Sequence, residues 1–373
     1  MDLCAALSPY AESGDVPGLV ALVARGDDVQ VEVLGQQGPG GVPMRRDSLF
    51  RAASITKPLT AALAMVLVQD GLLDLDAPVS DLLPELASPR VLRTPTSPLE
   101  DTVPCERPIT ARHLLACTSG LGFTTIDSPV VPLLGERLHQ GSMRVGDVPP
   151  PDEWVRRLAE IPLIHQPGEG WTYNLSYDLL GVLLARAADT SLADLMAERL
   201  LEPLGMVDTG FHVPAAEVAR FAALHGHRGG SLVVTDQPEG AFTEPPAFAS
   251  GAGGLVTTGD DWLAFGRMLL AGGGSLLDDG SVRLMTTDHT TAQQRAMAGF
   301  FLDGQGWGFG GSVDTSVLSP WNVPGRYGWV GGTGTAAYVD PRHGVVSVLL
   351  TQVELDSPES AAVLESFWAA AAA

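Results

Sequence analysis

Residues 49–73 read LFRAASITKPLTAALAMVLVQDGLL, and this stretch contains Lys57, the only lysine of the chain. From Thr60 onward apolar residues follow with little interruption, which predicts a buried helix. Ser54 then stands at the N-cap or in the first turn of that helix, and Pro58 fits a first turn and few other helical positions. Because residues three apart share a helix face, we expect the Ser54 hydroxyl and the Lys57 amine to meet.

This serine–lysine pair is suited to nucleophilic catalysis. A serine at a helix N-terminus lies beside the positive end of the helix dipole and beside free N–H groups, which stabilise a developing oxyanion. Apolar neighbours should lower the pKa of the Lys57 amine, so that it can accept the proton of Ser54. The other 21 basic residues are arginines, which do not act as bases. Chance survival of one lysine is the alternative, and the Ser-x-x-Lys spacing at a helix start argues against it.

The composition is that of a large, acidic globular protein. Hydrophobic residues make up 45% of the 373 residues, which supplies a core and excludes intrinsic disorder. The formal charge is 22 − 44 = −22, so we expect no nucleic-acid partner and no docking on anionic membranes. Cys4, Cys105 and Cys117 have neither zinc-site nor disulfide-framework spacing. Without a signal-peptide pattern or a membrane-length apolar stretch, a cytoplasmic location is expected.

Strand patterns occur near both ends of the chain, and helical patterns lie between them. Strands are predicted as a hairpin in residues 18–35 and as single strands in residues 306–313, 326–332, 335–340 and 344–353. Helices are predicted within residues 108–122, 151–161, 175–188, 190–206, 259–273 and 357–373. Residues 87–108 are expected to form an exposed excursion, and residues 122–151 are expected to be loop-like.

This order predicts an α/β (α+β) fold with one mainly antiparallel sheet. The sheet is built from both ends of the chain, flanked by helices and interrupted by an inserted helical region. We expect a discontinuous sheet domain of residues 1–80 and 232–373 and a mainly helical domain of residues 81–231. The active site should lie in the groove between them.

Tyr173 and Asn174 directly precede the helix predicted for residues 175–188. Tyr173 is either an interface aromatic with a solvated hydroxyl or a phenol or phenolate that shares protons with the serine–lysine pair. In the second case the nearby ammonium should lower its pKa below the usual value of roughly 10. Tyr177 falls inside the helical pattern, so we expect it in the core.

A glycine-rich stretch follows the strand predicted for residues 326–332. Glycine permits a backbone to approach a ligand closely, so the N–H of Gly332 is a candidate donor to an oxyanion. An ordinary hairpin turn is the alternative. His225 and His227 are the only close pair of histidines, and a loop pair is favoured over metal ligation. His113 is expected to be a structural, hydrogen-bonding histidine, and we expect neither a metal nor another cofactor.

Four segments in this order resemble the serine β-lactamase and penicillin-binding-protein superfamily: RAASITK at 51–57, PITARHLLACTSGL at 108–121, WTYNLSYDLLG at 171–181 and YGWVGGTGTAAYVDP at 327–341. The branch most similar is that of class C β-lactamase-like esterases, the family VIII-type carboxylesterases, over residues 16–353. The resemblance implies that Ser54 is the acylated nucleophile and Lys57 its activating partner, and that Tyr173 assists proton transfer. It also implies an oxyanion hole formed by the backbone amides of Ser54 and Gly332.

The same resemblance implies that Asn174, Trp329 and Gly331 bind substrate, and here the sequence departs from the family pattern. The second motif is commonly Tyr-x-Asn, but position 175 is Leu and Asn174 stands one place early. In the third motif Trp329 occupies the place of a cation. A substrate carboxylate would therefore lose a charged hydrogen bond worth roughly 1.5–3 kcal/mol, unless the fold aims Arg326 or Arg342 inward.

These features favour hydrolysis of small, neutral carboxylic esters through a serine acyl-enzyme. The expected partner is a small-molecule ester, and the oligomeric state is left open. The alternatives are an amide or β-lactam hydrolase, an acyltransferase of the same fold, or a penicillin-binding-like protein that is acylated without turnover.

Overall fold

The computed structural model describes residues 2–140 and 145–373. Its main sheet has seven antiparallel strands within these residues, in the order β2-β1-β13-β12-β11-β10-β9. The strands are β1 (Gly18–Arg25), β2 (Asp28–Gly35), β9 (Gln305–Trp307), β10 (Ser312–Asp314), β11 (Tyr327–Gly331), β12 (Thr335–Asp340) and β13 (Val345–Thr351). Because β1 pairs with β13, the two ends of the chain form one sheet, as predicted.

Both faces of this sheet are covered by helices. Alternate residues of a strand point to opposite faces, and in β1 the residues Leu19, Ala21 and Val23 pack in the core shared with α1 (Leu3–Ser13) and α12 (Pro358–Ala372). Val20 and Leu22 belong to the larger core that contains the helices of the other face. This burial on both sides explains why β1 is a continuous apolar run.

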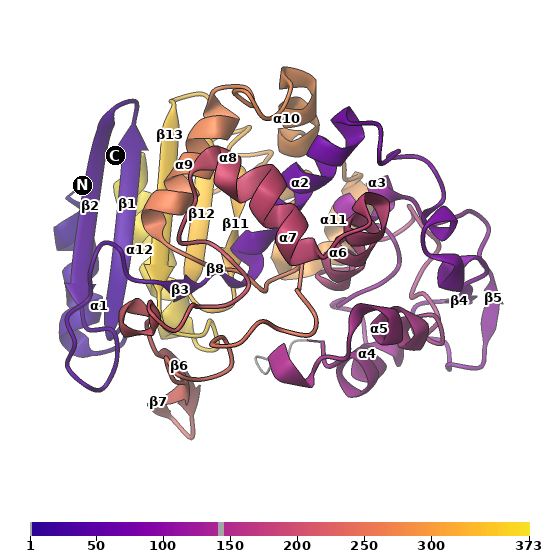
Figure 1. The fold of residues 1–373 in the computed structure, drawn as a ribbon, viewed down its shortest axis with the longest axis horizontal. Coiled ribbons are helices and arrows are strands. Elements are labelled where there is room, and N and C mark those ends of the chain that lie inside the picture. The colour runs from indigo at the N-terminus through magenta and orange to yellow at the C-terminus, as the bar shows by residue number, and fades with distance from the viewer. Residues whose placement is uncertain (1, 141–144) are drawn as a thin grey trace.

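The helical region lies beside the sheet, with α2 between the two (Figure 1). The remaining helices are α2 (Lys57–Gln69), α3 (Ala111–Leu115), α4 (Val130–Leu138), α5 (Pro151–Leu158), α6 (Leu175–Ala188), α7 (Leu192–Met196), α8 (Glu202–Leu204), α9 (Gly259–Leu270), α10 (Asp279–Thr286) and α11 (Ala292–Ala298). Three short pairs of strands lie outside the main sheet: β3 (Phe50–Arg51) with β8 (Val256–Thr257), β4 (Arg90–Leu92) with β5 (Thr102–Pro104), and β6 (Leu224–Arg228) with β7 (Ser231–Asp236).

Several local predictions need correction. Residues 122–151 were expected to be loop-like, but they contain α4, which buries Val130, Leu134 and Leu138 at four-residue intervals. Prolines and a glycine within and beside this helix hide the pattern. The excursion expected at 87–108 is mostly exposed, as predicted, and it also contains the β4–β5 pair. The domain division stays a prediction, and its boundary at 231/232 falls inside β7.

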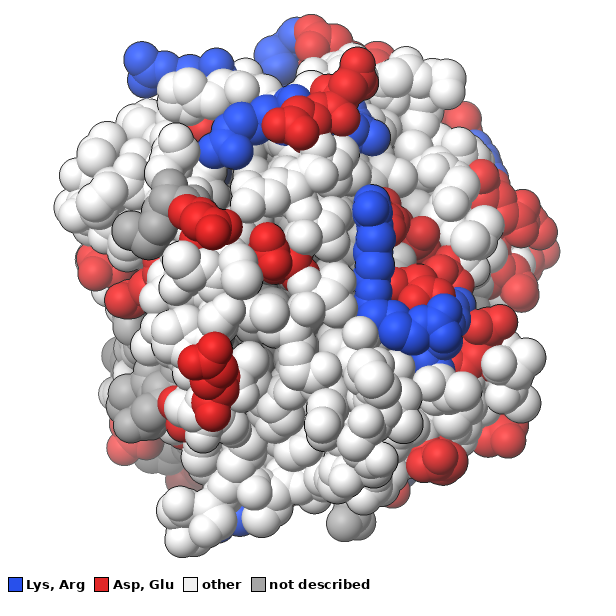
Figure 2. Space-filling model, turned by 90° about the vertical axis from the view of Figure 1, so that its left-hand side faces the viewer, with Lys and Arg blue, Asp and Glu red and all other residues white. Residues whose placement is uncertain are grey.

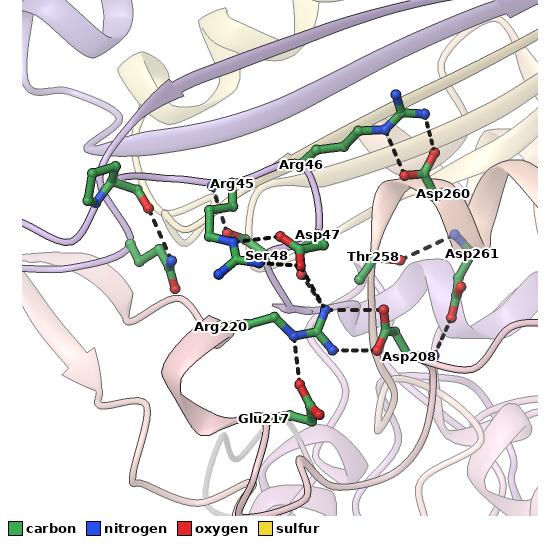
Figure 3. Close-up of polar contacts among 12 residues, drawn as sticks. Arg45, Arg46, Asp47, Ser48, Asp208, Glu217, Arg220, Thr258, Asp260 and Asp261 are labelled. Carbon is green, nitrogen blue, oxygen red and sulfur yellow. Dashed lines mark hydrogen bonds and ion pairs between the residues drawn. The ribbon is translucent and has the colours of Figure 1, made fainter.

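A network of ion pairs anchors the segment that leads into β3 (Figure 3). The guanidinium of Arg220 contacts both Asp208 and Glu217, and its Nη1 donates to the carbonyl of Asp47 at 2.7 Å. Arg46 forms a two-bond pair with Asp260 at the start of α9. Fork-shaped contacts of this kind fix geometry as well as charge, so the chain enters β3 in a defined position.

On the face that Figure 2 shows, acidic and basic side chains gather at the upper edge and along the right-hand side, and a few acidic side chains stand singly among uncharged ones elsewhere. Within the described residues, no helix has the length and apolar character needed to cross a bilayer.

Candidate active site

Ser54 lies in a 3₁₀ turn, Ala53–Thr56, that runs directly into α2. This turn is held from several sides. The N–H of Ala52 donates to the carbonyl of Leu255 at 2.8 Å, and the Ala52 carbonyl accepts from the hydroxyl of Thr335 at 2.8 Å. Ala53 has φ = 46°, a strained value for a residue with a side chain. The main chain in front of Ser54 is therefore tied to β12 and to the segment before β8.

Lys57 is fully buried, and its Nζ has three oxygen partners at 2.7 Å: Ser54 Oγ, Asn174 Oδ1 and the carbonyl of Ala252. A neutral amine has two N–H groups and one lone pair. With both N–H groups donated to Asn174 and Ala252, the lone pair points at the hydroxyl of Ser54. Burial lowers the pKa of Lys57 to about 7, opposed by the negative charge of Asp178. The arrangement can thus draw a proton from Ser54 near neutral pH.

Tyr173 stands beside this pair as a buried phenol. A β-bridge to Phe123 fixes its backbone, its hydroxyl accepts a hydrogen bond from Trp329 Nε1, and a side-chain hydrogen bond links it to Ser54. The expected lowering of its pKa was wrong: burial raises the pKa of Tyr173 above its usual value despite these two hydrogen bonds. Because the oxygen already accepts from Trp329, the O–H proton is free to be donated toward Ser54 or a leaving group.

Asn174 reaches Lys57 through an unusual backbone turn. Its φ and ψ are 82° and −67°, and the N–H of Leu175 bonds to the carbonyl of Tyr173 at 3.2 Å. This is a γ-turn of the strained kind, with positive φ. The turn directs the side chain of residue 174 at the Lys57 amine. An asparagine one place earlier than in the family pattern can therefore still reach this amine.

The third-motif residues separate into two groups. Gly332 lines the same cavity as Ser54, and its carbonyl accepts from the N–H of Leu355 at 2.8 Å. Trp329 and Gly331 were expected to bind substrate, but neither is among the residues that line this cavity. Trp329 lies behind Tyr173 and packs edge-on against Trp307, with ring centroids 4.8 Å apart. Its contact is with the phenol rather than with the cavity.

The cavity beside Ser54 has a volume of about 400 Å³. Its apolar lining includes Trp154 and Phe248, whose rings pack at 5.0 Å. The charged side chains that line it are Arg51, Asp178, Glu354 and Asp356. A larger cavity of about 960 Å³ lies along α6 and α7, and none of Ser54, Lys57 and Tyr173 lines it.

The lining offers little to a substrate carboxylate. Arg51 is buried, paired with Asp236, and stacked on the ring of Phe221 at 4.0 Å. The two arginines considered as substitutes for the missing cation lie elsewhere. The guanidinium carbon of Arg326 lies 3.7 Å from the ring centroid of Tyr338, on the far side of the sheet. Arg342 is exposed in the turn after β12.

Two groups beside Lys57 were missed in the sequence. Asp178 is an acidic residue inside an otherwise apolar helix pattern, and this is the signal that could have found it. Cys117 is a buried thiol whose Sγ accepts from the backbone of Asn174, and burial raises its pKa to about 12, so it is neutral. Tyr177, expected in the core, is fully buried and donates its hydroxyl to the carbonyl of Leu115.

The three histidines considered in the sequence have structural partners. His113 shares a capping box with Thr110 at the start of α3, which fits the structural role expected of it. His225 and His227 lie on strand β6 rather than in a loop, and His227 Nδ1 is 2.8 Å from Asp356. Within residues 2–140 and 145–373, no cluster of three histidine, cysteine or acidic side chains is arranged to hold a metal ion.

The chain is similar to known proteins over most of its length. The family model Beta-lactamase matches residues 4–369. The chain belongs to the Beta-lactamase family. It is 35% identical to Esterase EstB of Burkholderia gladioli over 90% of this chain and 85% of that protein, and 31% identical to Lovastatin esterase of Penicillium rubens over 84% and 82%.

A solved structure of EstCE1, described as a hydrolase with promiscuous acyltransferase activity, superposes with a TM-score of 0.80. The two chains are 24% identical over 98% of this chain and 97% of the other. This likeness shows a shared fold, and the Beta-lactamase family assignment and α/β architecture expected from the sequence are confirmed. The family has esterase and acyltransferase relatives.

Proposed function

We propose that this protein hydrolyses small, uncharged carboxylic esters through an acyl-enzyme on Ser54. The observation that carries the proposal is the 2.7 Å contact between Lys57 Nζ and Ser54 Oγ, with the two other Nζ contacts fixing the direction of the lone pair. A buried amine with a lowered pKa is a competent general base for a serine hydroxyl.

The proposed reaction proceeds in two halves. Ser54 Oγ attacks the ester carbonyl while its proton passes to Lys57, and the backbone N–H groups of Ser54 and Gly332 stabilise the oxyanion. As the carbon–oxygen bond breaks, the ammonium of Lys57 returns the proton to the leaving alcohol, and the Tyr173 phenol donates a hydrogen bond to the same oxygen. Water then attacks the acyl-enzyme, its proton passes to Lys57, and Ser54 is released as the hydroxyl.

Two features support an uncharged ester as substrate. The carboxylates of Asp178, Glu354 and Asp356 line the cavity, while Arg51, the arginine among its described lining residues, is occupied by Asp236. A substrate carboxylate placed there would be desolvated without a cation to pair with. The esterase names of two relatives, EstB and lovastatin esterase, point to the same reaction class.

A pair of chromogenic substrates tests the proposal. We expect a p-nitrophenyl short-chain ester to be turned over at least a hundredfold faster than a chromogenic cephalosporin, and Ser54→Ala to abolish the ester turnover. Faster hydrolysis of the cephalosporin would favour the β-lactamase alternative. A burst of one equivalent of p-nitrophenol without turnover would favour a penicillin-binding-like protein. Ester product appearing only when an acceptor alcohol is added would favour acyl transfer.

A further inference from the structure

Asp178, in α6, is a buried acid that the steps above do not use. Its side chain borders the cavity, and only 8% of the residue is exposed. Its Oδ1 accepts a hydrogen bond from the hydroxyl of Ser250 at 2.6 Å and another from the N–H of Ala252 at 3.2 Å. An acid at this depth is expensive to ionise, so its retention among apolar neighbours calls for a local reason.

Ala252 connects this acid to the amine. Its N–H donates to Asp178, and its own carbonyl accepts from Lys57 Nζ at 2.7 Å. The contact depends on a close approach of the main chain to α6, because a Cβ added at Gly251 would lie 2.5 Å from the carbonyl of Tyr177. The position of the Lys57 acceptor is thus set by α6 through Asp178.

We propose that Asp178 is a positioning residue for Lys57. It clamps the segment 250–252 so that the Ala252 carbonyl orients the amine, and its negative charge stabilises the ammonium that forms when Ser54 is deprotonated. This inference rests on the proposed function, because it assigns Asp178 a role only if Lys57 is the base. Asp178 itself does not touch the reacting atoms.

The groups that face the Lys57 amine are mostly uncharged. They are Ser54 from the 3₁₀ turn, Asn174 and the ring of Tyr173 from the segment before α6, and the neutral thiol of Cys117. Asp178 and Cys117 are the groups whose charge acts on the amine, and both favour its protonated form. The thiol is neutral at ordinary pH, so Asp178 is the charged partner of the amine: burial raises the pKa of Asp178, and the hydrogen bond from Ser250 and the charge of Lys57 oppose that rise.

The isosteric variant Asp178→Asn tests the role. The amide oxygen still accepts from Ser250 and Ala252, so the variant removes chiefly the charge. An ammonium without its counter-charge loses its proton more easily, so the acidic limb of the kcat/KM profile should move to lower pH by about one unit. The plateau value of kcat should fall about tenfold, because the ammonium formed during attack is less stabilised. The fraction of folded enzyme is measured by titration with a fluorophosphonate, and rates are expressed per labelled site.

The matched control is Asp261→Asn, which removes the carboxylate of another buried aspartate. Asp261 accepts from Thr209 and from the N–H of Asp208, and it does not act on the Lys57 charge. We expect its pH profile to equal that of the wild type. If Asp178→Asn does not fold, Ser250→Ala replaces it: loss of that hydroxyl disfavours the ionised acid, so the limb should move in the same direction by a smaller amount.

The outcomes separate this inference from the proposed function. A limb that stays in place or moves to higher pH in Asp178→Asn, with wild-type turnover intact, overturns the role of Asp178 alone. An equal shift in Asp261→Asn also overturns it, because the effect would then be one of global charge. A wild-type protein that turns over no ester and takes no label defeats the proposed function instead.

Discussion

Lys57 Nζ donates to Asn174 Oδ1 at 2.7 Å across 117 residues of sequence. The asparagine reaches the amine only because the backbone at residue 174 adopts a strained γ-turn with φ = 82°. Strain of this kind costs of the order of 1–3 kcal/mol and persists only where the surroundings impose it. Here the β-bridge between Tyr173 and Phe123 on one side and the start of α6 on the other impose it. Asn174 thus contacts the Lys57 amine and also lines the cavity beside Ser54, so its role in binding substrate stays a prediction.

Asn174→Asp should move the acidic limb of kcat/KM in the direction opposite to Asp178→Asn. A carboxylate in contact with Nζ stabilises the protonated form of Lys57, because an opposite charge this close raises the pKa of a lysine by about 1–3 units. Activity at pH 7 should fall at least tenfold and recover as the pH rises. Asn322→Asp, at a residue whose amide oxygen accepts from Ser319 N, serves as the control and should leave the profile unchanged. A profile in Asn174→Asp that superposes on the wild type would show that the contact does not govern the base.

The wild-type enzyme should show a kcat/KM that rises with pH through about 7. The sign follows from Lys57, which burial holds at a pKa of about 7 and which must be neutral to accept the Ser54 proton. Protonation below that pH removes the base from the free enzyme. Initial rates with an uncharged ester across pH 5–9 measure the limb. Activity that is flat across this range, or that rises as the pH falls, would exclude Lys57 as the base.

Trp329→Phe should lower kcat about three- to tenfold while KM changes little. The indole N–H donates to the Tyr173 hydroxyl, and a lost hydrogen bond of about 0.5–1.5 kcal/mol leaves the phenol less well oriented. Tyr327→Phe is the control. It removes another buried hydrogen-bonding group from the same strand, the Tyr327 hydroxyl, which donates to the carbonyl of Phe309 and not to Tyr173. It should lower thermal stability without lowering kcat. A rise in KM with kcat preserved in Trp329→Phe would return Trp329 to the substrate-binding role first expected of it.

Two neighbouring glycines should respond differently to alanine. A Cβ at Gly331 would lie 2.1 Å from Thr335 Oγ1 and 2.5 Å from the carbonyl of Ala52, so Gly331→Ala pushes on the turn that carries Ser54. Overpacking of this kind costs about 1–3 kcal/mol. A Cβ at Gly332 meets nothing within 4 Å. Gly331→Ala should lower both the unfolding temperature and the rate of fluorophosphonate labelling. Gly332→Ala should leave the unfolding temperature unchanged. Equal unfolding temperatures for the two variants would contradict this packing.

The parts of the molecule predicted well from sequence depend on short-range patterns. Ser54 and Lys57 are three residues apart at a helix start, so their contact follows from helix geometry alone. The strands of the main sheet either alternate apolar and polar residues or form continuous apolar runs, and both patterns predict strands directly. The helix α4 was missed because Pro132 and Gly135 interrupt a pattern that its buried side chains still follow.

The parts predicted poorly depend on how distant segments pack. The pKa of Tyr173 was expected to fall because a cation lies near, but the aromatic rings around it, including Trp171 and Trp307, exclude water and raise it. The role inferred for Asp178 depends on its contact with the segment 250–252. Ala252, in this segment, is 74 residues away from Asp178 in the sequence. No local pattern in the sequence gives the distance between these segments.

Intact mass spectrometry after treatment with a fluorophosphonate probe shows directly whether Ser54 is the nucleophile. Wild-type protein should gain the mass of one probe, peptide mapping should place the probe on Ser54, and Ser54→Ala should remain unlabelled while keeping the wild-type unfolding temperature. Lys57→Met, in which the hydroxyl loses its base, should label at least a hundredfold more slowly. A probe found on another residue, or a Ser54→Ala variant labelled as fast as the wild type, would contradict the assignment of Ser54 as the nucleophile.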